Sequence, residues 1–351
     1  MSEASPTPPR PRRNLARVRL LDIASRAKVS IMTVSKAMRD EPDISSATKS
    51  KIKLLAQQMG YVPNSAAASL RNTRTRLLGV VLPSLSHPYW IRVLSGIEEE
   101  AHARGYHLLV GQTLQRAERE EQVLRGFFAR NADGFLVAPV YRLAAQAPVY
   151  QFLAAQGTPA VVLGQRALFC ADFPNVECGD LQAGERATRH LLELGHRHIA
   201  FFAGPVVSPQ SQERYEGYRR ALREAGLTQD DKCLYNAGTS MEEGEAAALQ
   251  FLHERCAATA IVAINDMVAA GVMSVLTQQG ISVPRQVSVV GAGNFHFSDK
   301  LPSPLTTMHL PKFSLGTAAV DLLLKQLEGH RVESKRLPCE LIARASTAPP
   351  P

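Results

Sequence analysis

Apolar residues recur with a helical period near the start of the chain. The first apolar face consists of Leu20, Ile23, Ala24 and Ala27. Residues 28–30 interrupt this period before a second periodic stretch, residues 31–38. Ser30 is suited to cap that second helix, and Val34 and Met38, four residues apart, can face the first one. The pattern predicts two short helices joined by a tight turn.

A third amphipathic stretch begins at Ser45 or Ser46. Its apolar stripe consists of Ile52, Leu55, Ala56 and Met59. Gly60 follows where a left-handed C-terminal cap is expected, because glycine adopts that conformation without steric cost. Residues 18–62 are therefore predicted to form a small all-α helix-turn-helix domain.

From residue 77 onward, short apolar runs alternate with amphipathic stretches. The expected strands are residues 77–82, 106–110, 134–138, 160–163, 199–203, 260–264 and 287–291. The expected helices include residues 90–104, 183–194, 213–225 and 266–279. Runs this apolar, bounded by Gly, Pro and Asp, are typical of parallel strands that are buried on both faces. The pattern predicts an α/β body of two lobes, each built on a doubly wound parallel sheet.

The regions outside these domains lack an apolar period. Residues 1–17 are rich in Pro, Arg, Ser and Thr, which predicts a disordered basic tail, and residues 347–351 are expected to form a short tail. No run of about 18 apolar residues occurs, and the start of the chain has no apolar signal-peptide core. We therefore expect a cytoplasmic protein with no membrane partner.

Cysteine usage points to reduced thiols. The five cysteines are Cys170, Cys178, Cys233, Cys256 and Cys339. They are scattered and lack the short paired spacing of metal sites or redox pairs. Histidines 196 and 198 are two residues apart near the start of an expected strand, so their side chains point to opposite faces. We expect neither a metal site nor a cofactor.

The basic residues are concentrated at the start of the chain. Residues 1–76 hold 15 Lys and Arg against 5 Asp and Glu, whereas the rest holds 25 against 27. A positive segment on a near-neutral body favours binding to the phosphates of DNA, because neutralising phosphates releases counterions. A solvated basic tail is the alternative for the arginines of residues 10–19 alone, but the charge continues into a segment that is predicted to fold.

The order and spacing of several short motifs resemble a known family. The motifs are Leu21-Asp22-Ile23-Ala24, Val29-Ser30, Thr33-Val34-Ser35-Lys36, Ile44-Ser45, Thr48 and Gly60-Tyr61-Val62-Pro63-Asn64. They resemble the DNA-binding head of the lactose/galactose repressor family of bacterial transcriptional regulators, and the resemblance extends over residues 18–346. It implies a sequence-specific regulator, by family habit a repressor, that binds a pseudo-palindromic operator as a homodimer and responds to a small effector.

The resemblance assigns DNA contacts in the head. Ile31 and Met32 occupy base-reading positions, where apolar side chains can contact thymine methyl groups in the major groove. Their expected neighbours at the DNA are Ser30, Thr33, Ser35 and Lys36. Arg19 and Lys49 are expected to contact phosphates, or to be simply solvated. The alternative for Ile31 and Met32 is the core of a three-helix bundle.

Residues 63–76 are expected to form a hinge helix or linker. Asn64 can cap a short helix, and the alanines around Ala67 permit close approach of a second copy. In the family, hinge helices pair on DNA and a leucine wedges into the minor groove. Leu70 holds that position here, beside Arg71, and a wedge of this kind bends the duplex. A plain Ala-rich linker is the alternative.

The body resembles a periplasmic sugar-binding protein whose lobes close on a ligand. Lobe 1 is expected at about residues 77–178 and 311–336, and lobe 2 at about residues 179–308 and 337–346. In such sheets, ligands bind at the carboxyl ends of the strands.

The expected effector contacts in this body come from both lobes. Tyr89 and Trp90 offer aromatic faces, Arg214 offers a guanidinium fork, and Asn265 and Asp266 offer polar groups. Two of these positions have plainer alternatives. Trp90 can pack in the core, and Arg214 can pair with a glutamate of its own helix.

Two departures from the family bear on the effector. Gly293 stands at a position that is commonly acidic, and Leu310 stands where a glutamine is frequent. A cleft without these groups is less suited to a neutral sugar. The nearby polar residues are Arg142, Asn294, His296 and His309. Their basic members favour an anionic effector, such as a sugar acid or a phosphate ester.

The competing interpretation is a small-molecule-binding protein or an α/β enzyme with a nonspecific basic tail. The sequence contains no Gly-Lys-Ser/Thr phosphate loop, no Gly-x-Ser-x-Gly elbow, no His-Glu-x-x-His pair and no Gly-x-Gly-x-x-Gly after its first strand. We therefore expect no enzymatic activity. A transport protein would require a secretion signal and would not need the basic head.

Overall fold

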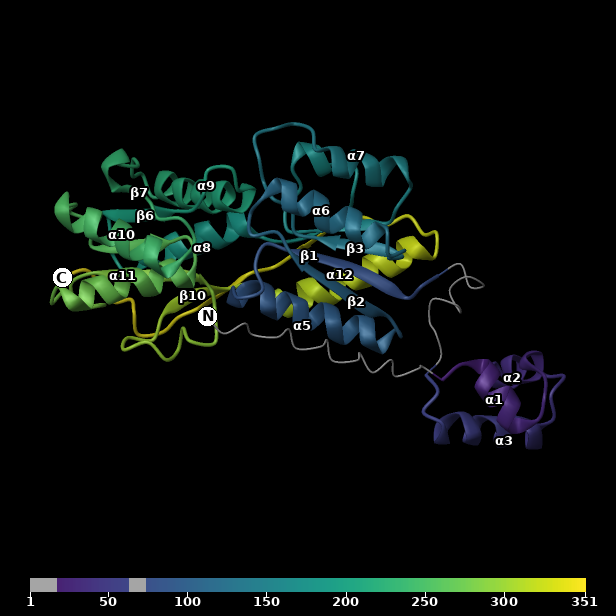
Figure 1. Ribbon diagram of the computed structural model, residues 1–351. Coiled ribbons are helices and arrows are strands. Elements are labelled where there is room, and N and C mark those ends of the chain that lie inside the picture. The colour runs from purple at the N-terminus through teal and green to yellow at the C-terminus, as the bar shows by residue number, and fades with distance from the viewer. Residues whose placement is uncertain (1–17, 63–73) are drawn as a thin grey trace, which may run out of the picture. The chain divides into compact units, whose positions relative to one another are not determined.

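The structure is a computed structural model that describes residues 18–62 and 74–351 (Figure 1). These residues fall into two compact units, one on each side of the junction between Thr73 and Arg74. The first is called the head and the second the body below, and each is described by itself. No helix in the described ranges is long and apolar enough to cross a membrane.

The head consists of three short helices. They are α1 (Leu20–Ala27), α2 (Ile31–Met38) and α3 (Ser46–Gln58). The Ser30 hydroxyl accepts a hydrogen bond from the Thr33 N–H at 3.0 Å, so Ser30 is the N-cap of α2, as the sequence predicts. Ser45 caps α3 in the same way. Gly60, with φ of 70°, follows α3 in the left-handed conformation that glycine favours.

One apolar side from each helix forms the interior of the head. The buried residues are Ile23, Ala24, Val34, Ala37, Ile52 and Ala56. The side chains of Met38, Leu55 and Met59 pack against them and are partly buried. The helical period of the sequence thus gave the correct inward faces, and three helices this short are stable only because they bury these faces against one another.

The first sheet of the body has six parallel strands in the order β11-β5-β4-β3-β1-β2. Its strands are β1 (Leu77–Leu82), β2 (His107–Gln112), β3 (Gly134–Val137), β4 (Ala160–Leu163), β5 (Asn175–Cys178) and β11 (Lys335–Leu337). Helices α5 (Pro88–Ala103) and α12 (Lys312–Leu327) pack together on one face, and α6 (Ala117–Phe128) and α7 (Pro148–Ala155) lie on the other (Figure 1). We call this half lobe 1.

The second sheet has the order β12-β10-β9-β8-β6-β7, with only β12 antiparallel. Its strands are β6 (Ile199–Ala203), β7 (Leu234–Asn236), β8 (Ala260–Ala263), β9 (Ser288–Gly293), β10 (Thr306–His309) and β12 (Glu340–Ile342). The helices pack in pairs, α8 (Asp180–Glu193) with α9 (Pro209–Glu224), and α10 (Met241–His253) with α11 (Asp266–Gln278). This half is lobe 2.

The chain passes between the two sheets three times. The crossings run from β5 to α8, from β10 to α12, and from β11 to β12. Two doubly wound sheets joined in this way are the predicted fold class. Because the carboxyl ends of the parallel strands lead into these crossings and into helix N-termini, polar side chains from both lobes gather there.

The end of the chain is bound to lobe 2, although the sequence analysis placed residues 347–351 in a tail. The carbonyl of Ala348 accepts a hydrogen bond from His196 Nε2 at 2.8 Å, and its N–H donates to Ser288. The Thr347 hydroxyl is within hydrogen-bond distance of Thr306. Polar side chains inside lobe 2 therefore fix these two residues, and such partners leave no signal in the local sequence.

Candidate functional site

The start of α2 presents two exposed apolar side chains. Ile31 is 47% exposed and Met32 is 63% exposed, whereas Val34, two residues further on, is buried. The alternative that Ile31 and Met32 belong to the core of the head is therefore wrong. Because the cap at Ser30 holds the first turn of α2, both side chains project from a rigid helical end. An α-helix with such an end fits the major groove of DNA.

Polar groups surround this pair. The hydroxyls of Ser30 and Thr33 lie 2.9 Å apart. Ser35 accepts, through its carbonyl, a hydrogen bond from Arg39 Nε at 3.0 Å. Lys36 forms an ion pair with Asp43, and the hydrogen bond from Lys36 lowers the pKa of that carboxyl below its usual value. Lys36 is therefore occupied within the head and must leave Asp43 to reach a phosphate.

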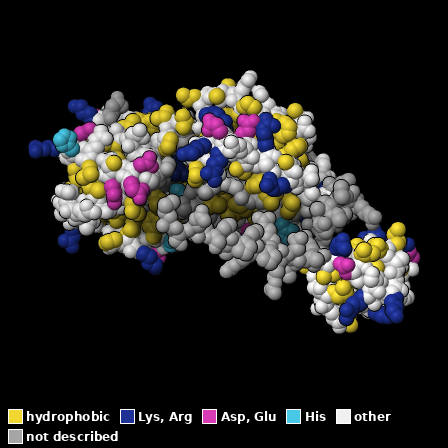
Figure 2. Space-filling view, in the orientation of Figure 1, with side chains coloured by type: hydrophobic (Ala, Val, Ile, Leu, Met, Phe, Trp, Pro, Cys, Tyr) yellow, Lys and Arg dark blue, Asp and Glu magenta, His cyan; other side chains and the backbone are white. Residues whose placement is uncertain are grey.

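The two residues proposed to contact phosphates, Arg19 and Lys49, differ in how closely other groups of the head hold them. The Arg19 side chain is 74% exposed, with Nε 3.9 Å from Asp22. Lys49 Nζ donates to the carbonyl of Asp40 at 3.0 Å. Residues 18–62 hold eight Lys and Arg against four Asp and Glu. Lys and Arg side chains are visible on the head in Figure 2. The head therefore keeps the excess of positive charge that a phosphate backbone attracts.

Four of the proposed DNA contacts lie outside the described residues. They are Asn64, Ala67, Leu70 and Arg71. The expected tail, residues 1–17, and most of the expected hinge, residues 63–73, lie there too. The proposed wedge and hinge helix stay predictions.

Tyr89 and Trp90 lie in the first turn of α5 and contact each other edge to face, with ring centroids 4.8 Å apart. Both are partly buried against the main core of the body. Tyr89 Oη lies 3.8 Å from Cys178 Sγ, and burial raises the pKa of the phenol well above its usual value. The packing of Trp90 thus agrees with the alternative that this side chain belongs to the core.

Arg214 on α9 pairs with Asp180, the first residue of α8. Its Nε donates to Asp180 Oδ1 at 2.8 Å, and its Nη1 donates to the carbonyl of Ile264 at 2.6 Å. Burial raises the pKa of Asp180, while Arg214 opposes that shift. The plain alternative, a pair with Glu213 or Glu216 on its own helix, is wrong, because the partner comes from the neighbouring helix.

Asn265 and Asp266 hold the start of α11 in place. Asn265 accepts from the Val268 N–H at 2.8 Å and donates to the carbonyl of Thr239 at 2.9 Å. Asp266 is completely buried and accepts hydrogen bonds from Ser298, Thr307 and the Phe295 N–H. Their hydrogen bonds give both residues a structural function.

Arg142 lies apart from the other basic candidates. It forms an ion pair with buried Glu120, and its guanidinium lies 4.8 Å from the centre of the Phe169 ring. All three residues belong to lobe 1. The structure therefore does not bring Arg142 together with Asn294, His296 and His309.

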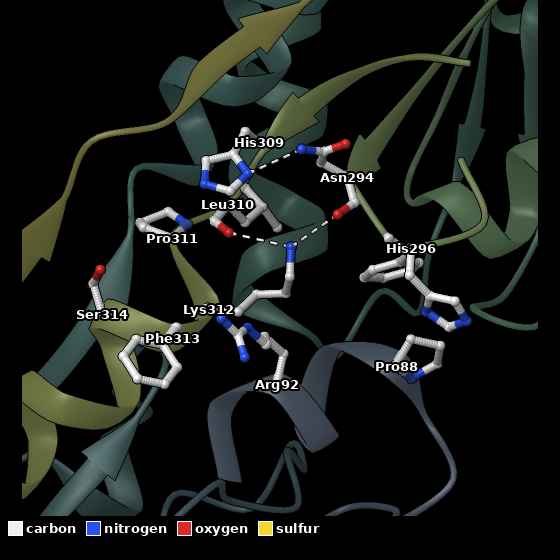
Figure 3. Close-up of a pocket in the computed structure, with 11 residues that line it drawn as sticks. Pro88, Arg92, Asn294, His296, His309, Leu310, Pro311, Lys312, Phe313 and Ser314 are labelled. Carbon is white, nitrogen blue, oxygen red and sulfur yellow. Dashed lines mark hydrogen bonds between the residues drawn. The ribbon is translucent and has the colours of Figure 1, made fainter. Parts of the chain in front are cut away.

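Those last three residues do come together in one cavity of about 400 Å³ (Figure 3). The cavity is lined by Pro88 and Arg92 of α5, residues 294–296 after β9, and residues 309–314, which lead from β10 into α12. Asn294 Nδ2 lies 3.2 Å from His309 Nδ1, and His296 is exposed. Both lobes and one of the three crossings thus contribute to a single polar cavity.

Lys312 lies at the centre of the cavity in Figure 3 and was missed by the sequence analysis. Its side chain is buried, and Nζ donates to the carbonyls of Gly293, Asn294 and Leu310. Burial lowers the pKa of the ammonium. One signal in the sequence could have pointed to Lys312: it lies two residues after Leu310, where the family frequently has a glutamine. A lysine in an amphipathic helix is usually solvated, so the sequence alone did not single it out.

The two lobes also touch next to this cavity. The rings of His87 in lobe 1 and Phe295 in lobe 2 meet edge to face, with centroids 5.7 Å apart. Further along, Gln210 Nε2 of lobe 2 lies 3.5 Å from Tyr141 Oη of lobe 1. Groups that contact each other across the lobes in this way are sensitive to any change in lobe orientation.

A second, larger hollow of about 570 Å³ also has walls from both lobes. Three of its residues are glutamates, namely Glu177, Glu213 and Glu216. Arg336 neutralises two of them, at 2.7 Å from Glu177 and 3.4 Å from Glu213. In the described ranges, no group of three or more His, Cys, Asp or Glu side chains is arranged to hold a metal ion.

A three-helix head with an exposed recognition-type helix, joined to a two-lobed α/β body, defines a class of DNA-binding regulators. Residues 19–64 match the model of bacterial regulatory proteins of the lacI family, and residues 188–347 match the periplasmic binding protein-like domain. The repressor CytR of Escherichia coli (strain K12) is 30% identical over 329 residues, which cover 93% of this chain and 95% of CytR.

Solved structures agree with this match. A lac repressor dimer bound to operator and the anti-inducer ONPF has a TM-score of 0.85 and 27% identity, covering 95% of this chain and 99% of that one. A complex of the transcriptional regulator CelR with cellobiose has a TM-score of 0.72 and 26% identity, covering 94% and 100%. The chain belongs to the lacI family of bacterial regulatory proteins. It is a DNA-binding transcriptional regulator, as the sequence predicts.

Proposed function

We propose that this chain is a cytoplasmic transcriptional repressor that reads its operator with Ile31 and Met32 at the start of α2. The observation that carries the proposal is the exposure of both side chains, 47% and 63%, on a capped helix end. Apolar side chains there distinguish bases by contact with thymine methyl groups and by fit to the groove. Ser30, Thr33 and Ser35 supply polar groups beside them, and Arg19, Lys36 and Lys49 supply charge.

The repressor acts as a homodimer on a pseudo-palindromic site. A single head contacts one half-site, and a two-fold dimer presents a second head to the other half-site. The similarity to a lac repressor dimer bound to operator supports this arrangement. The hinge expected at residues 63–76 is shorter at its end, because Thr75 and Arg76 are hydrogen-bonded to Asp133 of the body. Residues 63–73 then serve as the hinge, with Asn64 as a cap, Ala67 at the contact between the copies, and Leu70 and Arg71 at the minor groove.

An effector bound between the lobes controls operator affinity. A ligand shifts DNA binding only by the difference in its affinity for two lobe arrangements. Groups from both lobes meet around the cavity of Asn294, His296 and His309, so a ligand there contacts both. The cellobiose complex of a similar regulator supports a small effector in this kind of body. The elements around this cavity are held in place by contacts of Tyr89, Arg214, Asn265 and Asp266.

Binding without catalysis is the function that the residues favour. The buried polar groups nearest the cleft, such as the Arg214–Asp180 pair and Asp266, are satisfied by structural partners. The matching relatives and structures are transcriptional regulators. We therefore infer that the chain has no enzymatic activity.

Selection of duplexes from a random pool by the intact protein, followed by sequencing, tests the proposal. We expect enrichment of two related half-sites in inverted orientation. The variant Ile31→Ala with Met32→Ala should lose or change this preference while keeping residual affinity for phosphates. A pool that returns unenriched after repeated selection would refute sequence-specific binding.

A further inference from the structure

We propose that the cavity around Lys312 binds the anionic group of a small organic acid or phosphate ester, and that this anion is the effector. The inference rests on the proposed function, since it names the ligand class of the same interlobe region. Two cations that line the cavity, Arg92 and Lys312, and a third behind its wall, Arg344, form no ion pair in the described ranges.

Lys312 and Arg92 point into the cavity in Figure 3. Lys312 is 7% exposed, its ammonium donates hydrogen bonds to three backbone carbonyls, and it lies 5.5 Å from the centre of the Phe295 ring. Arg92 is exposed, with its guanidinium 4.6 Å from the centre of the Phe313 ring. No Asp or Glu of the described ranges lies within ion-pair distance of either cation. Buried Asp266 offsets part of the Lys312 charge from a distance, but neither cation has a carboxylate in direct contact.

Arg344 adds a third positive charge behind the wall of the cavity. Its Nη2 donates to Asn294 Oδ1 at 2.6 Å, and its Nη1 donates to the carbonyl of Leu305 at 2.6 Å. It too forms no ion pair within the described part of the chain. Because Asn294 accepts from Arg344, its amide nitrogen is directed toward His309 and the cavity.

Other buried or partly buried cations of the body are paired with carboxylates. Arg214 is paired with Asp180, and Arg142 is paired with Glu120. A buried charge is costly unless it is paired, so most proteins supply a carboxylate. The cavity lining of residues 88, 92, 294–296 and 309–314 contains no carboxylate at all. An anionic ligand would supply the missing negative charge.

The start of α12 reinforces this charge. No side chain caps the helix, and in the described part of the chain no acceptor is bonded to the N–H groups of Phe313 and Ser314, which both line the cavity. A helix N-terminus carries partial positive charge and free donors, which favour carboxylates and phosphates. Here the helix end acts together with Lys312 and Arg92 on the same cavity.

The size and position of the cavity fit a metabolite larger than a simple ion. Its volume of about 400 Å³ holds a sugar-sized molecule. His309, Asn294 and His296 offer hydrogen-bonding groups for hydroxyls, and Phe313 offers an apolar face. Because Asn294 and His296 belong to lobe 2 and Arg92 to lobe 1, an anion held among them draws the lobes together. The ligand therefore has different affinities for open and closed arrangements.

Calorimetry and thermal shift on the intact protein test the proposal. The probes are inorganic phosphate, glucose 6-phosphate, gluconate and neutral glucose, each at millimolar concentration. The variants are Arg92→Gln, which changes an exposed residue, and Lys312→Met, with Arg104→Gln at the other end of α5 as the control. We expect at least one organic anion to bind, and its affinity to fall roughly tenfold to a hundredfold in Arg92→Gln and Lys312→Met but not in the control. Binding of gluconate would identify the anionic group as a carboxylate, and binding of glucose 6-phosphate would identify it as a phosphate.

The proposal is overturned if no anion of the panel stabilises the wild type more than Arg92→Gln, or if neutral glucose binds as well as the anions. Arg92→Gln keeps the test valid should Lys312→Met fail to fold. The same samples are titrated onto a selected operator duplex. Specific DNA binding that responds only to a neutral sugar refutes the anion and leaves the repressor in place. If the ligand-free protein shows no specific DNA binding, the proposed function itself is refuted.

Discussion

Arg214 and Asp180 form a buried ion pair that joins α9 to α8, with Arg214 Nε 2.8 Å from Asp180 Oδ1. The glycines beside it allow this contact. A Cβ on Gly184 would lie 2.0 Å from the carbonyl oxygen of Arg214, so the two helices meet backbone to backbone. The arginine that the family resemblance assigns to an effector is thus already bound to a carboxylate, and any ligand contact must share it.

Removal of one partner of this pair should destabilise the body strongly. Arg214→Ala leaves the carboxylate of Asp180 buried without a partner, for an expected loss of about 3–5 kcal/mol in the free energy of unfolding. The matched control is Arg104→Ala, which removes an exposed pair with Glu100 and should cost about 0.5 kcal/mol or less. Urea unfolding measures both variants. Equal losses would contradict the assignment of a buried pair.

The close contact of α8 and α9 should not tolerate a methyl group. Gly184→Ala places a Cβ against the Arg214 carbonyl and forces the helices apart, with an expected loss of at least about 1–3 kcal/mol. Gly126→Ala on α6 serves as the control, because its Cβ would meet only the end of the Arg130 side chain at 3.4 Å. That substitution should stabilise by about 0.5–1 kcal/mol, since alanine loses less entropy on folding. Thermal unfolding of the two variants should shift in opposite directions.

Substitution in the head should separate base reading from phosphate binding. Met32→Ala removes an exposed apolar contact and should cost about 1–3 kcal/mol on the selected operator but little on an unrelated duplex. Arg19→Ala, which removes a 74% exposed cation proposed to contact a phosphate, should weaken both duplexes alike and reduce the salt dependence of binding. Competition binding at two salt concentrations measures the difference. An equal effect of Met32→Ala on both duplexes would remove Met32 from base recognition.

Stability should fall in mildly acidic solution through His196. Its Nε2 donates to the Ala348 carbonyl and its Nδ1 lies 2.8 Å from the Thr259 hydroxyl, and burial lowers its pKa below the usual value of about 6.5. The unfolded chain therefore takes up the proton first as the pH falls. The contribution is complete above about pH 6.5 and is lost as the pH falls toward the lower pKa of the folded state.

Unfolding at about pH 7.5 and about pH 5.5 tests this assignment. His196→Gln keeps a donor for Ala348 and does not titrate, so its loss of stability between the two pH values should be smaller than that of the wild type. Buried Asp180 and Asp266, whose pKa values are raised, oppose the trend in both proteins and cancel in the comparison. An equal loss of stability between the two pH values in the wild type and in His196→Gln would exclude His196 as the titrating group.

The sequence predicted those features that depend on local patterns. The expected strand at residues 77–82 coincides with β1, and the cap at Ser30 and the inward side of Val34 follow from short-range spacing. The strands β5, β7, β10, β11 and β12 were not predicted. They have three or four residues with little apolar character, and pairing with distant strands holds them in place.

The candidate site was only partly predictable for the same reason. His309 and Asn294 are found together as expected, because His309 ends β10 and Asn294 follows β9, the neighbouring strand of the same sheet. Arg142 was wrongly expected beside these residues. It pairs with Glu120 on α6, a helix that was not predicted from the sequence. Lys312 becomes recognisable only when the crossing into α12 buries it among three carbonyls. Such long-range contacts have no counterpart in the spacing of residues.

The most direct test of sequence-specific recognition by the head is fluorescence anisotropy of the intact protein on its selected operator and on a scrambled duplex of the same composition, over a range of salt. We predict operator binding about a thousandfold tighter than scrambled binding near physiological salt, with the difference lost in the Ile31→Ala, Met32→Ala double variant. Equal affinities for the two duplexes, both falling steeply with salt, would contradict it and reduce the head to a nonspecific basic module.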